Sequence, residues 1–300
     1  MKEKVIRIGT RRSELAVTQT NLVAEAIEKT GNGMKTELVL KQTEGDRILD
    51  KPLLEFGGKG VFVTEFEQAL LHGEIDLAVH SAKDMPMELE KGLGIVAVLK
   101  REDPRDVLVT MAGSSFTGKK ELVIGTSSLR RQMQIYEMGK NLWPDMEVRC
   151  ENLRGNVQTR LYKLSQGEYD GIILAAAGLK RLGLWEDKRY QYQCFDCESF
   201  VPAGGQGILA VEGRLHSGME AFYAKIHDEE TGLCLSLERR ILKLLEAGCH
   251  EPIGIYSRLI GDKMEVFGIN RRGEETKRIH LKGELTELDD LAHLAAKGLS

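Results

Sequence analysis

Arginine and hydroxyl side chains recur where predicted strands pass into predicted helices. Arginine binds carboxylate or phosphate groups through two parallel hydrogen bonds, each contributing about 1.5 to 3 kcal/mol. A single arginine is most often a solvated surface group, but the repetition of these loops predicts a site for a small polyanion. We expect carboxylates rather than phosphates, because neither G-x-x-x-x-G-K-[ST] nor G-x-G-x-x-G occurs in the chain. The loops contain Thr10, Arg11, Ser13, Thr126, Ser127, Ser128, Arg130, Arg131, Arg154, Arg160, Lys180 and Arg181.

The segment HSAKDMP at 80–86 places ionisable side chains at the end of a predicted strand, before a proline turns the chain. A structural interpretation makes His80 a buried, hydrogen-bonded residue and Asp84 a turn former. A functional interpretation places the Asp84 carboxylate in the site, where it accepts N–H groups, stabilises a cation or relays a proton. The residue types here are compatible with both interpretations.

Five cysteines lie at positions 150, 194, 197, 234 and 249, without the spacing of a disulfide framework. The pair Cys194 and Cys197 lacks a second pair or a nearby histidine, so we expect loop thiols and no metal site. Cys249 follows Gly248, a natural helix C-cap, and we expect its thiol on an exposed turn. No catalytic triad is completed around this thiol. Packing, metal binding, nucleophilic attack and attachment of a group therefore remain open for it.

Composition restricts the class of protein. The 300 residues include 42 Lys and Arg against 46 Asp and Glu, a net charge of -4, which does not suggest the basic footprint of a nucleic-acid-binding protein. The longest apolar run, IILAAA at 172–177, is far shorter than the roughly 20 residues that cross a bilayer. The amino-terminal stretch enters a strand pattern directly instead of a leader's apolar stretch. We expect a cytoplasmic protein that binds neither nucleic acid nor membranes.

A repeated pattern of strand, loop and helix organises the first two thirds of the chain. IGT at 8–10 recurs as IGT at 124–126, and GEID at 73–76 is matched by GEYD at 167–170. These repeats predict two similar α/β lobes. We expect the chain to cross between the lobes at 100–108 and again at 199–207. Two crossings imply a cleft for a ligand.

From about residue 222 the pattern changes to a helix, three strand-like runs and a last helix near Thr286, where T-x-x-D resembles a capping box. We predict an α/β fold of two lobes with a small α+β third domain that contains a three-stranded antiparallel sheet. The predicted units are residues 1–100 with 200–221, residues 101–199, and residues 222–300.

Ordered motifs along essentially the whole chain resemble those of the porphobilinogen deaminase family, also called hydroxymethylbilane synthases. They are IGTRRSELA, GGKGVFV, DLAVHSAKDMP, REDPRD, IGTSSLRRQ, LRGNVQTRL, AAGLKRLG, GQG and GCHEPIG. The resemblance implies two lobes like those of periplasmic binding proteins and a third domain that carries the cofactor. The chain departs from the family pattern at Glu55, Ala247 and His250, and none of these is expected to carry the chemistry.

The resemblance also implies a function. A family member is a transferase of porphyrin and haem biosynthesis that joins porphobilinogen units head to tail onto a dipyrromethane cofactor, with loss of ammonia at each addition. Four additions are followed by hydrolysis, which releases linear hydroxymethylbilane. The cysteine of the GCHEPIG motif, here Cys249, carries the cofactor through a thioether. We expect the product to pass to uroporphyrinogen-III synthase, and we expect a monomer.

Site residues are carried over from the same resemblance. Asp84 is the expected catalytic residue, because a carboxylate stabilises the positively charged pyrrole intermediates. The expected cofactor-binding residues are Cys249, Ser81, Lys83, Asp84, Thr126, Ser128, Arg130, Arg131, Arg154 and Gly155. The expected substrate-binding residues are Arg11, Ser13, Gln19, Lys59, Arg154, Arg160 and Arg181. An alternative class is a two-lobed carboxylate-binding sensor that performs no chemistry, although such a binder has no need of an exposed thiol on a third domain.

Overall fold

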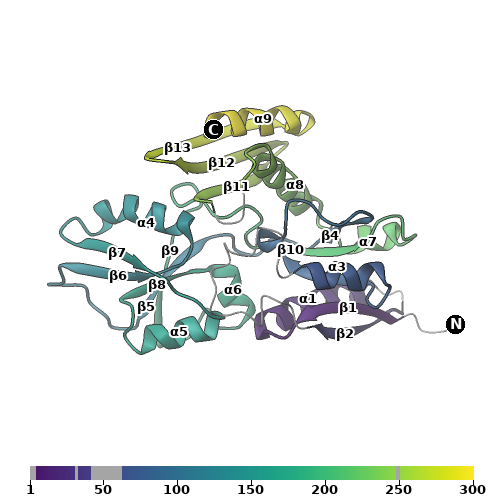
Figure 1. Ribbon diagram of the computed structural model, residues 1–300, viewed down its shortest axis with the longest axis horizontal. Coiled ribbons are helices and arrows are strands. Elements are labelled where there is room, and N and C mark those ends of the chain that lie inside the picture. Colours follow the sequence, from purple (N-terminus) through teal and green to yellow (C-terminus); the bar gives the residue numbers. More distant parts are fainter. Residues whose placement is uncertain (1–4, 31–32, 42–62, 248–250) are drawn as a thin grey trace.

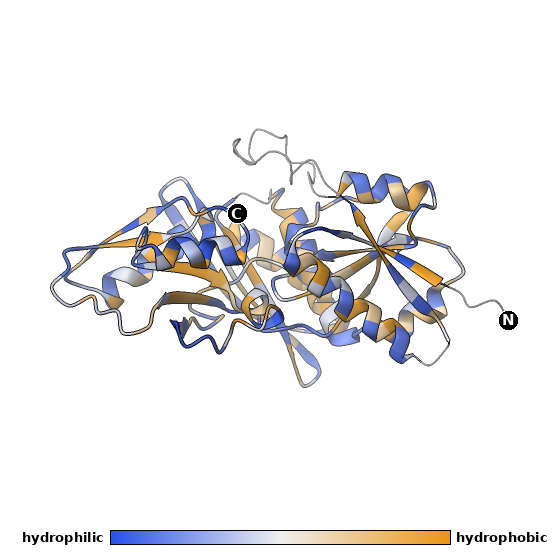
Figure 2. Cartoon of the chain, turned by 90° about the horizontal axis from the view of Figure 1, so that it is seen from below, coloured by the Kyte–Doolittle hydropathy of each residue, from blue (hydrophilic) through white to orange (hydrophobic). Residues whose placement is uncertain are grey.

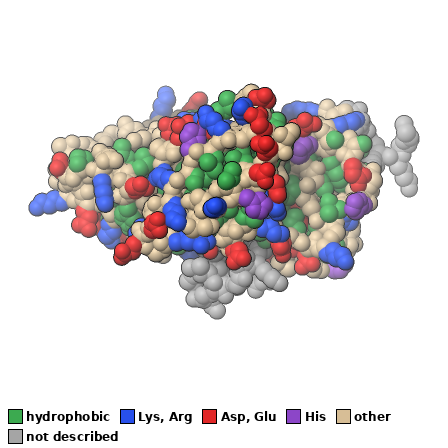
Figure 3. Space-filling view, turned by 90° about the horizontal axis from the view of Figure 1, so that it is seen from above, with side chains coloured by type: hydrophobic (Ala, Val, Ile, Leu, Met, Phe, Trp, Pro, Cys, Tyr) green, Lys and Arg blue, Asp and Glu red, His purple; other side chains and the backbone are tan. Residues whose placement is uncertain are grey.

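The computed structural model describes residues 5–30, 33–41, 63–247 and 251–300. Two α/β lobes lie side by side along the long axis, and the carboxyl-terminal domain lies over the junction between them (Figure 1). None of the described helices has the length and apolar character needed to cross a membrane. Seen from the side of the third domain, acidic and basic side chains are interspersed across the surface (Figure 3).

The first lobe is built on a five-stranded sheet in the order β2-β1-β3-β10-β4. β1 runs parallel to β2 and β3, whereas β10 is antiparallel to β3 and β4. The side chains of Phe222 and Tyr223 from α7 lie in the core of this lobe, although the sequence placed them in the third domain. The elements are β1 (Val5–Arg11), α1 (Glu14–Lys29), β2 (Lys35–Lys41), α3 (Thr64–Leu71), β3 (Leu77–Ser81), β4 (Leu93–Val98), β10 (Leu209–Arg214) and α7 (Glu220–Ile226).

The second lobe repeats this plan with a sheet in the order β7-β6-β8-β5-β9. β6 runs parallel to β7 and β8, whereas β5 is antiparallel to β8 and β9. The elements are β5 (Asp106–Met111), β6 (Glu121–Gly125), α4 (Leu129–Leu142), β7 (Glu147–Glu151), α5 (Val157–Ser165), β8 (Gly171–Ala175), α6 (Ala176–Arg181) and β9 (Tyr190–Cys194).

The chain crosses between the lobes twice, at 99–105 and 195–208, between the ends of the flanking strands. Each crossing delivers one antiparallel strand to the lobe it enters: the first leads into β5 and the second into β10. The two sheets therefore match strand for strand. This topology confirms the predicted fold class of two similar α/β lobes.

Hydrophobic burial explains why these segments form sheets with helices on both faces. Five successive residues of β5, from Asp106 to Thr110, are buried, as expected for a strand covered on both faces. The central strand β8 is entirely apolar apart from its glycine, while the helices carry an apolar and a polar side (Figure 2). Ile8 in the first lobe and Ile124 in the second are both fully buried. Burying one such side chain contributes about 1.5 to 3 kcal/mol.

The third domain packs two helices on a three-stranded antiparallel sheet, as predicted. Its core joins Leu237 and Ile241 of α8 to Ile255 and Val266 of the sheet. The last helix begins after Glu287 without a side-chain cap, so the predicted capping box at Thr286 is wrong. The elements are α8 (Glu229–Leu244), β11 (Ile253–Ile260), β12 (Lys263–Arg272), β13 (Glu275–Glu284), η3 (Leu285–Glu287) and α9 (Leu288–Leu299).

Helix α8 ends earlier than the predicted C-cap at Gly248. Glu246 takes a left-handed backbone with a φ of 54°. Its N–H donates to the carbonyl of Lys243 in the last turn at 3.0 Å, and the N–H of Ala247 donates to the carbonyl of Leu242 at 3.1 Å. These two bonds form a Schellman motif that ends the helix without glycine.

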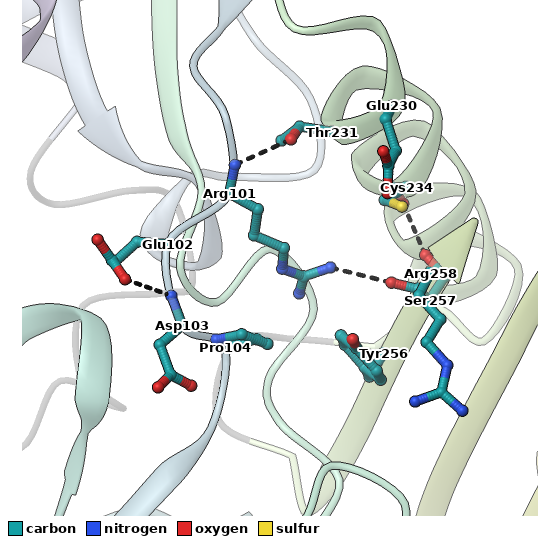
Figure 4. Close-up of a pocket in the computed structure, with 10 residues that line it drawn as sticks. All are labelled: Arg101, Glu102, Asp103, Pro104, Glu230, Thr231, Cys234, Tyr256, Ser257 and Arg258. Atoms are coloured by element: carbon teal, nitrogen blue, oxygen red, sulfur yellow. Dashed lines mark hydrogen bonds between the residues drawn. The ribbon is translucent and has the colours of Figure 1, made fainter. Parts of the chain in front are cut away.

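The third domain is fastened to the first crossing by a buried ion pair. The guanidinium of Arg101 contacts the carboxylate of Glu238 on α8 at 2.7 Å, and the Glu238 side chain is fully buried. Arg101 also donates to the carbonyl of Ser257, and its backbone N–H donates to the hydroxyl of Thr231 (Figure 4). A cavity of about 250 Å³ lies between the crossing, α8 and β11. The crossing and the third domain are thus held together by charged contacts.

Candidate active site

The carboxyl end of β3 leads into a short turn, η2 (Ala82–Asp84), which holds the predicted catalytic acid. The last strand residue, Ser81, exchanges hydrogen bonds with Gln19 of α1 at 3.0 and 3.3 Å. The residue after the turn, Met85, is fully buried. Asp84 lies between these fixed points and is exposed. The turn therefore presents a carboxylate from a backbone that is held on both sides.

Lys83 precedes this carboxylate and points toward the second crossing. Its ammonium donates to Oε1 of Gln206 at 3.3 Å. Burial lowers the pKa of Lys83 to about 8, Asp84 opposes that shift, and the positive charge of Arg131 adds to it. Because Arg131 belongs to the second lobe, Lys83 lies where the electric fields of both lobes act.

A fully buried carboxylate, Asp106, organises the arginines at the start of α4. It accepts from Arg130 at 2.7 Å and from two nitrogens of Arg131 at 2.7 and 3.0 Å. Both arginines are themselves buried, and each also donates to a backbone carbonyl. Burial alone would raise the pKa of Asp106, but the charges of Arg130 and Arg131 hold it well below the usual range. Both guanidinium groups are thus fixed in place before any ligand binds.

The loops after β6 and β7 are joined to each other by hydroxyl groups. Ser127 donates to the carbonyl of Leu153 at 2.9 Å and accepts from the N–H of the same residue at 3.0 Å. Thr126 is buried, and its hydroxyl accepts from the N–H of Ser128. Ser128 is the N-cap of α4 and accepts from the N–H of Arg131. Here the predicted hydroxyl residues bond to the backbone and shape the loops.

The loop between β7 and α5 supplies Arg154, and α5 itself supplies Arg160. Asn156 caps α5, as predicted, by accepting from the N–H of Thr159 at 2.8 Å. Gly155 has a φ of 112°, and a Cβ there would lie 2.7 Å from the Thr159 side chain, so only glycine fits. Arg160 folds back and donates to the Gly155 carbonyl at 2.8 Å. Arg154 is exposed, and no hydrogen bond or ion pair within the described ranges involves it.

Charged groups of both lobes act on Arg160. Burial, with help from the charges of Arg131 and Arg154, lowers the pKa of Arg160 to about 10, whereas Asp84 raises it. Asp84 belongs to the first lobe and Arg160 to the second. A further bridge between the lobes is the hydrogen bond from Gln158 to Glu14 at 2.7 Å. The loops at the carboxyl ends of both sheets therefore face each other, as expected for ligand sites in open α/β folds.

The remaining predicted residues have different surroundings. Ser13 is the N-cap of α1 and accepts from Ala16 at 3.3 Å. Arg11 ends β1 and is half-buried. Arg181 donates to the carbonyl of Gly207 in the second crossing at 2.6 Å, and burial lowers its pKa to about 10. Lys59 and Cys249 lie outside the described residues.

The charges of this cluster do not balance. We define the inter-lobe cluster as the seven ionisable residues that the electrostatic couplings connect: Lys83, Asp84, Asp106, Arg130, Arg131, Arg154 and Arg160. Five of the seven are cationic and two are carboxylates, which leaves an excess of three positive charges. Dipyrromethane carries acetate and propionate groups on each ring, so an unbalanced cationic cluster fits it.

Two cavities in the described ranges are separate from this cluster. The cavity at the first crossing and another of about 380 Å³ beside β5 and β9 are lined by none of its residues. Cys194 and Cys197 are free thiols, and burial raises the pKa of Cys197 to about 12. Within the described ranges, no group of three or more His, Cys, Asp or Glu side chains could hold a metal ion.

Two residues of the site were not recognised from the sequence, namely Asp106 and Gln206. The motifs REDPRD and GGQG contain them, and both motifs were noted without a role for either side chain. The available signal was an acid directly after the first crossing and an amide within the second. Their partners are 24 to 123 residues away in sequence, so no local pattern identifies the pairing.

The fold and the cluster define a class: a two-lobed α/β protein with a cluster of excess positive charge where its lobes meet. Comparison with known proteins gives the family. The model described as "Porphobilinogen deaminase, dipyromethane cofactor binding domain" matches residues 6–219, and "Porphobilinogen deaminase, C-terminal domain" matches residues 232–298. The chain therefore belongs to the porphobilinogen deaminase family, which confirms the predicted enzyme class and dipyrromethane cofactor.

Individual relatives and solved structures add detail to the comparison. The porphobilinogen deaminase of Syntrophobacter fumaroxidans is 45% identical over 290 residues, which cover 94% of this chain and 90% of that protein. Among solved structures, the periplasmic aliphatic sulphonate binding protein SsuA from Escherichia coli covers 81% of this chain and 70% of its own, with a TM-score of 0.38 and 14% identity. The ligand binding component of an ABC-type import system from Staphylococcus aureus covers 81% and 76%, with a TM-score of 0.38 and 14% identity.

Proposed function

We propose that the inter-lobe cluster is the active site at which this chain joins porphobilinogen units. The chain links four units head to tail on a dipyrromethane primer, loses one ammonia at each addition, and releases linear hydroxymethylbilane by hydrolysis. The observation that carries the assignment is the excess of positive charge around Asp84. That excess attracts the acidic side chains of every pyrrole unit, whatever its place in the growing product.

Asp84 is the proposed catalytic residue. Its carboxylate is exposed at the tip of a fixed turn, so it can approach a bound ring without rearrangement of the backbone. Loss of ammonia from porphobilinogen leaves an electron-poor pyrrole, and the coupling step develops positive charge on a ring. A carboxylate held in place stabilises that charge and accepts the ring N–H group. The positive charges of Lys83 and Arg160 act on this carboxylate from the two lobes.

The cationic residues have a binding role in this proposal. Lys83, Arg131 and Arg154 are the residues we expect to hold the dipyrromethane, together with Arg130, Ser81, Thr126, Ser128 and Gly155. When bound, that group supplies the ring carbon to which the first unit is joined. Arg11, Ser13, Gln19, Arg160 and Arg181, with Lys59, are the proposed contacts of the incoming substrate.

Cys249 is the proposed anchor of the dipyrromethane. Intact-mass measurement of purified protein should give an excess equal to two linked pyrrole units, because the primer is attached covalently. The Cys249→Ser variant should lack that excess, while Cys234→Ser, a change at a buried thiol, should keep it. An unmodified mass in active, freshly made wild-type protein would contradict the assignment.

We extend the proposal to the oligomeric state, the location, the use of the product and the domain division of this chain. The enzyme acts as a monomer. It works in the cytoplasm, and its product is consumed by uroporphyrinogen-III synthase. We also propose a division into three parts near residues 1–100 with 200–221, 101–199 and 222–300, and the membership of β10 in the first sheet supports the first unit. Because α7 packs in the core of the first lobe, the third unit begins after Ile226.

A further inference from the structure

A single buried amide connects the two crossings to the turn that carries Asp84. Gln206 is fully buried in the second crossing. Its Nε2 donates to the carbonyl of Pro104 at 2.7 Å and to Asp106 at 3.1 Å, and its Oε1 accepts from Lys83 at 3.3 Å. The chemistry of the partners fixes the orientation of the amide, because an ammonium only donates and the other two groups only accept.

We infer that Gln206 is a positioning residue for the reaction: its amide holds the Lys83 ammonium beside Asp84 and links it to the Asp106 carboxylate that orders the arginines. The inference rests on the proposed function of the inter-lobe cluster. In this inference the second crossing both joins the lobes and positions Lys83. The Gln206 side chain thus connects the turn that carries Asp84 in the first lobe to the arginines of the second lobe.

The loop around Gln206 does not need this amide to keep its shape. The N–H of Gly205 donates to the buried carboxylate of Glu238 at 2.6 Å. The carbonyl of Gly207 accepts from the N–H of Glu102 at 3.1 Å and from Arg181 at 2.6 Å. The backbone carbonyl of Gln206 itself accepts from Arg101 at 2.9 Å. Main-chain contacts thus fix the loop, which leaves the side-chain amide to act on Lys83 and Asp106.

Lys83 depends on this amide because its surroundings disfavour the charged form. Four charged groups act on its ammonium: Asp84 in its own turn, Asp106 on β5, and Arg130 and Arg131 on α4. Within the described ranges, the hydrogen bond of that ammonium goes to Gln206. Burial already lowers the pKa of Lys83 to about 8. Loss of the amide oxygen would lower the pKa further, so the fraction of charged Lys83 would fall at neutral pH.

The test compares the pH dependence of kcat/KM, which reports ionisations of the free enzyme. Gln206→Met keeps the size of the side chain and removes its hydrogen bonds. We expect kcat/KM at pH 7 to fall about tenfold and its alkaline limb to move to lower pH. Gln206→Glu places a carboxylate against Lys83, and we expect its alkaline limb to move to higher pH. Opposite shifts in the two variants are the signature of a positioning role.

Gln134 offers a matched control. It is also a fully buried glutamine, and its amide exchanges hydrogen bonds with the backbone of Val201 at 3.0 and 2.6 Å. Its Nε2 also donates to the backbone carbonyl of Arg130 at 3.4 Å, whereas the hydrogen bond of the Lys83 ammonium goes to Gln206. We expect Gln134→Met to lower the melting temperature without moving the alkaline limb. The inference is overturned if Gln206→Met behaves in the same way, or if neither Gln206 variant moves the limb. If Gln206→Met does not fold, the direction of the Gln206→Glu shift decides. Wild-type protein that forms no hydroxymethylbilane would instead contradict the proposed function.

Discussion

The two lobes share one strand order but bury charge in different places. In the second lobe, β5 begins with Asp106, which pairs with Ala175 at the end of β8. The equivalent strand of the first lobe, β10, begins with Leu209, which pairs with Ser81 at the end of β3. At the same point of the same topology, one lobe has a buried carboxylate and the other has an aliphatic side chain. Topology alone therefore does not determine where the charged groups lie.

The loops that follow β3 and β8 also differ between the lobes. After β3, the first lobe presents Lys83 and an exposed Asp84. After β8, the second lobe continues into α6 with the buried residues Ala176 and Ala177. The first lobe thus exposes the carboxylate of this loop. The second lobe places its acid inside, where it holds arginines in position. Four carboxylate and hydroxyl positions allow this contrast to be tested by matched substitutions.

The largest expected effect is on stability, at Asp106. Asp106→Asn leaves Arg130 and Arg131 buried without their counter-charge, and we expect the free energy of unfolding to fall by about 3 to 5 kcal/mol. Urea denaturation at pH 7 measures it. Asp84→Asn, the same chemical change in the other lobe, should leave the free energy of unfolding within about 0.5 kcal/mol of wild type. Equal losses in the two variants would show that the lobes do not differ in this respect.

The next effect is on catalysis, at Asp84. Asp84→Asn keeps the shape of the side chain but removes the charge that stabilises a cationic ring, so we expect kcat to fall about 100- to 1000-fold. Release of ammonia from porphobilinogen measures the rate, and an unchanged circular dichroism spectrum shows that the fold is retained. Near-normal turnover would mean that the catalytic acid is a different residue. Asp84→Ala should give the same result, because the charge and not the side-chain volume matters.

The smallest expected effect concerns a feature that the lobes share. Ser13 and Ser128 cap the first helix of each lobe by accepting a backbone N–H three residues later. Ser13→Ala and Ser128→Ala should each lower the free energy of unfolding by about 1 kcal/mol. A larger loss for Ser128→Ala would indicate that its cap also supports the buried arginines. Thermal unfolding of both variants, measured side by side, distinguishes these outcomes.

The repeated pattern and the local sequence signals were sufficient for much of the molecule. The recurrence of IGT predicted two similar lobes, and the sheets confirm it because each repeat forms the same parallel strands. Asn156 was recognised as a helix cap because capping depends on residues three positions apart. The end of α8 was misplaced because Glu246, and not a glycine, adopts the left-handed conformation there. That choice depends on packing in the third domain and has no signal in the neighbouring residues.

The sequence by itself determined the strand, loop and helix units, the family, and the loops in which charged residues gather, because these follow from local spacing and ordered motifs. Only the tertiary structure decided which charged side chains are buried in ion pairs and which are exposed to solvent. Arg130 and Arg154 are indistinguishable as sequence letters, yet one is bound to a buried carboxylate and the other is exposed. The physical reason is that electrostatic partners are chosen by distance in space. Gln206 contacts Asp106 and Lys83 because the second crossing brings it between the two lobes.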